Sequence, residues 1–230
     1  MKSLVSSFFI LLVFLSPLFG QNGENNTIQF YEIMKSRDAG KPLELNGSEF
    51  LYDEWIPMKI FMEDGRVFDV AQARINILGG SIDVMHKGRE MELLLTFIDK
   101  VEINHESRSK SMMPIFRVKA KELPEKGFVE VLNAGEDIVL VRYHKYIVKA
   151  DPNAKILGLD PRPKVFNKQE IYVVKSKIAY EVSSKKDLKK VYKNKSRKID
   201  EIFDAENIDI KNPLALASLI ARVNVKDAQN

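Results

Sequence analysis

Three histidines are the side chains of this sequence best suited to acid–base catalysis or metal binding. They are His86, His105 and His144, and none lies at a metal-binding spacing such as H-E-x-x-H. His105 has Glu102 and Glu106 close by in the chain. We nevertheless interpret it as a solvated loop histidine, because no spacing here matches a known metal site. The sequence therefore predicts no metal ion and no other cofactor.

One pair of adjacent carboxylates, Asp53 and Glu54, stands between Tyr52 and Trp55. Paired acids can serve as general acid and base only if both reach one pocket. Neighbours along a strand instead point to opposite faces. We therefore expect solvent-facing acids at the start of a strand, with Trp55 in the core. No G-x-S-x-G motif or phosphate-binding loop is present, so we assign no catalytic residue. A hydrolase with an unrecognised carboxylate site stays open as an alternative.

The most distinctive charge feature is the segment 185–198, which holds eight basic residues and one acid, Asp187. A basic helix of this kind could bind an anionic membrane surface or another anionic ligand. The alternative is a solvated helix that docks on a sheet through Leu188, Val191 and Tyr192, with the acidic run at 200–209 partly neutralising its lysines. The candidate ligand or membrane-surface residues are Lys185, Lys186, Lys189, Lys190, Tyr192, Lys193, Lys195, Arg197 and Lys198.

The stretch Gly47–Leu78 predicts the first hairpin of an antiparallel sheet. Met58, Ile60 and Met62 alternate with polar residues, and Asp64-Gly65 supplies a tight turn. Short strands at regular spacing continue as far as residue 182, which favours an antiparallel β-sandwich or an open barrel. We therefore predict a mainly β (α+β) fold that ends in a C-terminal helical tail of two or three short helices.

Four segments give more local expectations. Residues 105–113 read as a polar loop, and 116–121 alternate between apolar and basic residues as in a strand with one wet face. The prolines and glycine of 150–170 predict a long connection, which is uncommon in compact domains unless it is functional or packed on itself. Residues 171–182 return to strand.

The helical tail has recognisable start signals. Ser184 followed by Asp187 resembles a capping box, in which side chains cover the free amides at a helix start. Ser196 is a candidate cap for a second helix. Asn212-Pro213 begins a third, because proline is tolerated in the first helical turn.

The N-terminal sequence predicts export. Residues 1–20 join one basic residue, a short apolar run and a terminal Gly20, as in a secretory signal peptide, and the run is too short for a transmembrane helix. We divide the rest into a mobile leader (21–46), an antiparallel β domain (47–182) and a helical tail packed on it (183–230). The chain has no cysteine, which excludes disulfides. We expect a soluble protein of the periplasm or outer-membrane surface, or a secreted one.

Three stretches also suggest a family. Gly47–Trp55 matches a GS-x-x-L-Y-D-E-W opening, Ala73–Ile77 an ARINI-like strand, and Ser184–Val223 a basic helical tail. With these the chain resembles uncharacterised exported β-rich proteins of Bacteroidota-type Gram-negative bacteria. The resemblance implies an envelope-associated protein of unassigned activity and transfers no catalytic residue. Together these observations favour a non-catalytic interaction module whose partner is an envelope protein or an anionic surface ligand, and not nucleic acid. A peripheral binder of anionic membranes acting through 185–198 is the second alternative.

Overall fold

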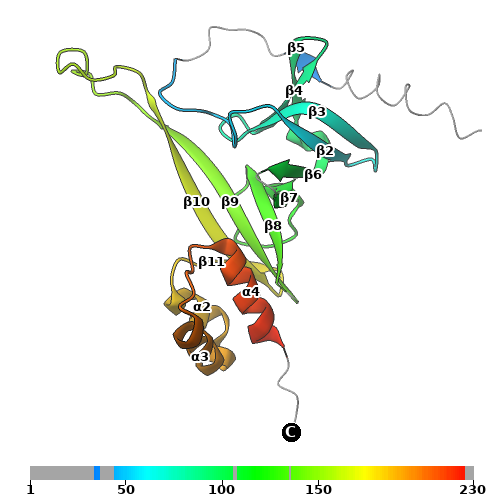
Figure 1. The fold of residues 1–230 in the computed structure, drawn as a ribbon, viewed down its shortest axis with the longest axis vertical. Coiled ribbons are helices and arrows are strands. Elements are labelled where there is room, and N and C mark those ends of the chain that lie inside the picture. The colour runs from blue at the N-terminus through cyan, green and yellow to red at the C-terminus, as the bar shows by residue number, and fades with distance from the viewer. Residues whose placement is uncertain (1–33, 37–43, 106–107, 135, 226–230) are drawn as a thin grey trace, which may run out of the picture. The chain divides into compact units, whose positions relative to one another are not determined.

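The computed structural model describes residues 34–36, 44–105, 108–134 and 136–225, so the predicted signal peptide and most of the leader lie outside the described residues. All described residues belong to one compact unit. They form one antiparallel sheet followed by three helices, which confirms the expected mainly β fold with its helical tail (Figure 1).

The sheet contains eleven strands in the order β1-β5-β4-β3-β2-β6-β7-β8-β9-β10-β11. Within the described residues its edge strands do not pair with each other, so the sheet is not closed into a barrel. The strands are β1 (Lys35–Ser36), β2 (Ile56–Met62), β3 (Val67–Asn76), β4 (Ser81–His86), β5 (Arg89–Leu94), β6 (Ile98–His105), β7 (Arg108–Pro114), β8 (Phe128–Ala134), β9 (Asp137–Val148), β10 (Lys164–Lys175) and β11 (Ile178–Glu181).

The first long hairpin, β2–β3, follows the sequence pattern closely. Met58, Ile60 and Met62 are all buried on one face of β2, as their alternation predicts. In the turn, Gly65 adopts a positive φ of 85° while Asp64 does not. An extra residue in β3 shifts the register between Ile56 and Met58, which is the signature of a β-bulge.

Both faces of β9 and β10 are buried at the helical end of the sheet. Val139 and Val173 pack against the helices, whereas Leu140 and Tyr172, their neighbours in sequence, pack into a second cluster around Ile115. A strand covered on both faces has no polar face to show, which explains the continuous apolar run in this part of the chain.

The helices that cover one face begin where the sequence signals place them. They are α2 (Lys185–Val191), α3 (Ser196–Glu206) and α4 (Pro213–Asn224). The Ser184 side chain accepts a hydrogen bond from the Asp187 amide, and the Asn212 side chain accepts from two amides at the start of α4. Ser196 is the first residue of α3 rather than its cap. No helix in the described part of the chain is long and apolar enough to span a membrane.

Two local expectations were wrong. Residues 105 and 108–113, the described part of the expected loop, lie in strands, because β6 and β7 pair from Val101–Met112 out to His105–Arg108. Residues 115–117 form a 3-10 helix and not a strand. Arg117 does not face water along a strand there. Its guanidinium donates to the Ile98 and Thr96 carbonyls and pairs with Glu63.

A third expectation misplaced a turn. The segment 171–182 is a hairpin and not one strand, since β10 turns into β11 through Ser176 and Lys177. Both turn residues adopt positive φ without being glycine or asparagine. The preceding connection is also shorter than expected, because β10 already begins at Lys164.

Candidate functional site

The lysines of the basic segment line one side of α2 and the turn that follows it. Lys185 and Lys189 pair with Asp200 at 2.9 and 2.7 Å, so α3 neutralises part of the charge, as the acidic run suggested. Lys186 and Lys193 are exposed and form no ion pair within the described residues. An open groove of about 510 Å³ lies along the lysine side chains Lys185, Lys186, Lys189, Lys190 and Lys193.

The remaining candidates of this segment serve the helical tail itself. Tyr192, expected on the basic surface, is 1% exposed and belongs to the core between the helices and the sheet. Lys195 donates to the Val223 carbonyl at 2.8 Å and Lys198 to the Val225 carbonyl at 3.1 Å. Arg197 pairs with Glu201 along α3. The structure therefore brings the lysines of α2 together and turns Tyr192 and Lys195 toward the protein.

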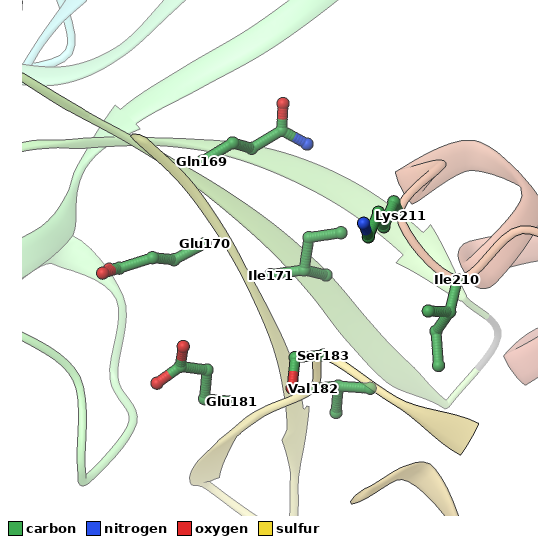
Figure 2. A pocket seen from close by; sticks show the side chains of 8 residues that line it. All are labelled: Gln169, Glu170, Ile171, Glu181, Val182, Ser183, Ile210 and Lys211. Atoms are coloured by element: carbon green, nitrogen blue, oxygen red, sulfur yellow. The ribbon is translucent and has the colours of Figure 1, made fainter. Parts of the chain in front are cut away.

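A pocket of about 320 Å³ lies at the β10–β11 edge, beside the loop that precedes α4. Figure 2 shows that the Glu170 and Glu181 side chains extend to one side of the strands, away from Ile171 and Lys211. The Glu170 carboxylate accepts hydrogen bonds from Lys168, Arg142 and Tyr172 at 2.8, 2.8 and 3.1 Å, respectively.

These contacts decide the protonation state of Glu170. Burial raises the pKa of the carboxyl, but the hydrogen bonds from Lys168, Arg142 and Tyr172 outweigh it and lower the pKa to about 2. The same neighbourhood, through burial and the Glu170 charge, raises the pKa of Tyr172 to about 12. A carboxylate that stays ionised and is bound by three donors ties strands together and cannot supply a proton at neutral pH.

The sequence-predicted acid–base candidates do not gather in this pocket. Asp53 and Glu54 are both exposed, as expected for acids at a strand start. His86 ends β4, and His144 lies on β9 with its Nδ1 3.5 Å from Arg142 Nη2. His105 ends β6, and its side chain lies outside the described residues. Among the described residues no group of three or more His, Cys, Asp or Glu is placed to hold a metal ion.

The feature that stands out chemically is the outer part of β9 and β10 with the connection 149–163, which we call the ribbon (Figure 1, the long loop at the upper left). Both strands are buried near the helices and exposed toward the connection. Tyr146 stacks on the cross-strand Phe166 with ring centroids 5.8 Å apart, and on His144 at 6.0 Å. The ribbon thus carries a ladder of rings on one face.

The ribbon ends in three large apolar side chains, Ile156, Leu157 and Leu159, which we call the apolar tip. They are 84, 62 and 58% exposed. Ile147 and Val148 at the outer end of β9 are also exposed. Exposed leucines scattered singly are common on protein surfaces, whereas here three large apolar side chains gather on one projecting loop.

The apolar tip is held open by an ordered backbone. One helical turn forms where the Leu157 amide donates to the Asn153 carbonyl at 3.0 Å. Gly158, at a φ of +68°, ends the turn, and the Leu159 amide returns to the Ala154 carbonyl at 2.8 Å. This is the Schellman pattern of a helix C-terminus. Ala154 fills the inside of the turn, 2% exposed, so the larger side chains face outward.

The base of the connection is fixed as well. Asn46 donates to the Pro163 carbonyl at 2.8 Å and accepts from the Val165 amide at 2.9 Å. Arg162 binds both carboxylate oxygens of Asp160, and these side-chain bonds, with the Arg162 amide, lower the pKa of Asp160 to about 2. Gly47 lies so close to Val165 that a Cβ there would approach the Val165 side chain to 3.1 Å.

Comparison of the chain with family models, with curated proteins and with solved structures returns no match.

The sequence pointed to the connection but not to its role. The apolar letters ILGL at 156–159, flanked by prolines and acids, were the available signal. Loop composition cannot tell whether such residues fold inward or outward. The positive φ of Gly158 and the small Ala154 decide this, and both act through the folded turn.

Proposed function

We propose that this protein is an exported, non-catalytic envelope module that binds its partner through the apolar tip of the ribbon. The observation that carries the proposal is the exposure of Ile156, Leu157 and Leu159 on a turn that is ordered by its own hydrogen bonds. A site that is already ordered loses little conformational entropy on binding, so its apolar area contributes more of its favourable free energy.

The location in the envelope rests on the signal peptide expected at 1–20 and on the resemblance to exported Bacteroidota-type proteins. The absence of a cysteine fits any compartment. The partner of such a module is an envelope protein or an anionic surface ligand. The interaction role is supported by where the exposed apolar side chains gather and not by a catalytic constellation.

Site-specific photo-crosslinking tests this proposal. The chain has no cysteine, so Leu157→Cys can carry a single thiol-coupled benzophenone. Val67→Cys is the matched control, because Val67 is 48% exposed and lies at the start of β3, outside the ribbon. In cell envelopes we expect adducts, to protein or to lipid, from position 157 and not from position 67. Equal labelling from both positions, or none from 157, would contradict the proposal.

A further inference from the structure

We propose that the apolar tip inserts into the boundary between headgroups and acyl chains of an anionic lipid membrane, with lysines of the ribbon on lipid phosphates. This inference rests on the proposed function and names its partner. The sequence suggested a membrane contact at the basic segment 185–198. That segment belongs to the helices that pack on one end of β9 and β10, whereas the apolar tip lies at the other end of these strands.

The shape of the site favours a fluid surface over a folded partner. Ile156, Leu157 and Leu159 project from a single turn, and each is more than half exposed. A side chain that docks in a protein groove usually has neighbours that complete a flat interface around it. The apolar tip continues into the exposed ends of β9 and β10, which carry Val148 and Phe166. Lipid can close around such a projection from all sides.

The charges around the apolar tip have the sign that anionic lipid requires. Residues 149–164 contain four basic residues and two acids. Arg162 and Asp160 form an ion pair. The remaining charged residues are three lysines, Lys149, Lys155 and Lys164, and one exposed acid, Asp151. None of these three lysines forms an ion pair among the described residues. Unpaired lysines beside an apolar projection are attracted to anionic headgroups, by about fivefold in affinity per lysine near the surface.

The aromatic ladder fits the same placement. Tyr146 and Phe166 lie on β9 and β10, just behind the apolar tip, and both are partly exposed. Lys164 lies over the Phe166 ring at 5.1 Å. Tyrosine and tryptophan rings are enriched at the headgroup level of membranes, where Tyr146 would lie. A second copy of this chain is a poorer occupant, because tip-to-tip contact would bring like charges of both copies together.

Co-sedimentation of the purified exported form (residues 21–230) with vesicles tests the proposal. The vesicles contain either phosphatidylcholine alone or a mixture of phosphatidylglycerol and phosphatidylcholine. We expect binding to the anionic vesicles that weakens with added salt. Replacing Ile156, Leu157 and Leu159 by serine should weaken that binding at least about tenfold. The combined Lys149→Gln, Lys155→Gln and Lys164→Gln variant should weaken it by up to about 100-fold, the product of about fivefold for each lysine.

A matched variant in α2, with Lys186→Gln, Lys190→Gln and Lys193→Gln, removes the same charge from the basic segment. It should bind as the unchanged protein does. Loss of binding in this variant, with binding retained in the serine variant, would overturn the proposal and assign the membrane contact to α2. All variants change exposed side chains, and unchanged thermal unfolding confirms that they fold.

The two proposals fail in different ways. If position 157 crosslinks to a protein while the chain does not bind vesicles, the lipid proposal fails and the interaction module stands. If position 157 crosslinks to nothing and vesicles do not bind, both fail. Vesicle binding that needs the apolar tip, together with lipid adducts from position 157, supports both.

Discussion

The buried hydroxyl of Tyr192 donates a hydrogen bond to Asp137 Oδ2 at 2.5 Å, joining the end of α2 to the first residue of β9. Asn224 at the end of α4 donates to the same oxygen at 2.7 Å. The Lys175 ammonium lies 4.2 Å from the centre of the Tyr192 ring. Burial, followed by the bond to Asp137, raises the pKa of Tyr192 well above its usual range. One carboxylate thus ties two helices to the sheet.

Removal of this hydroxyl should therefore loosen the helical tail. We expect Tyr192→Phe to lower the free energy of unfolding by about 1–3 kcal/mol, because Asp137 keeps its burial and loses one of its donors. Urea denaturation followed by circular dichroism measures the change. Tyr146→Phe removes an exposed hydroxyl on the ribbon and is the control, with an expected change below about 0.5 kcal/mol. Equal stability of Tyr192→Phe and the unchanged protein would show that the bond is not needed.

Ionised Glu170 should make the free energy of unfolding depend on pH in the acid range. Its folded pKa of about 2 lies below its ordinary value of 4.5, so the contribution is complete above about pH 4.5 and is lost as the pH falls toward 2. We expect Glu170→Gln to cost about 2 kcal/mol at pH 7 and progressively less between pH 4.5 and 2. Thermal unfolding across this range measures the difference. Glu181→Gln, an exposed carboxylate on the neighbouring strand, should show no such convergence.

Trp55 is half-buried beside the sheet, contrary to its expected place in the core. The Arg74 guanidinium lies between two rings, 3.7 Å from the centre of Phe50 and 4.0 Å from that of Trp55. Arg74 also pairs with Glu90 at 3.0 Å. Trp55→Ala should lower the free energy of unfolding by about 2 kcal/mol, because it removes the contact with Arg74 and the partly buried ring surface. Truncation of a fully buried aromatic side chain would cost about 3–5 kcal/mol.

Since Trp55 is the only tryptophan, its loss removes the usual fluorescence probe, and circular dichroism should follow unfolding instead. A loss above about 4 kcal/mol would place the ring in the core after all. Phe61→Ala is the matched control. It removes another half-buried ring, on β2, which contacts a single cation, Lys100.

Sequence patterns correctly predicted the features that depend on neighbouring residues, namely strand faces and helix starts. The alternation of Met58, Ile60 and Met62 determined their buried face, and the side-chain oxygens of Ser184 and Asn212 began helices where expected. The missed hairpin at 171–182 depends on contacts between distant segments. Ser176 and Lys177 form a turn with positive φ although neither is glycine or asparagine, and the pairing of β9 with β10 and the 121–178 bridge hold both ends of the hairpin in place.

The candidate site was predictable only in part. The run of lysines in 185–198 was visible, but the burial of Tyr192 depends on Asp137, a residue 55 positions away. The exposure of Leu157 likewise follows from a turn closed by backbone hydrogen bonds and not from composition. Charge can be counted in a sequence, whereas the face that a side chain takes is set by tertiary contacts.

The order of the apolar tip should depend on Gly158. Its φ of +68° is a conformation that costs other residues about 1–2 kcal/mol. We therefore expect Gly158→Ala to speed hydrogen exchange of the Leu159 amide, which bonds the Ala154 carbonyl, by about 5–30-fold. Amides in the centre of β9 serve as the internal control and should not change. Unchanged exchange at Leu159 would mean that the turn does not need the left-handed residue.

The central claim is that the apolar tip leaves water when the protein engages its partner. An environment-sensitive fluorophore on Leu157→Cys, in an otherwise cysteine-free chain, reports this directly. On addition of the envelope fraction of the producing cells we predict a blue-shifted, brighter emission from position 157 and no change from the same dye on Val67→Cys. Emission from position 157 that stays solvent-like, or that changes no more than at position 67, would contradict the account.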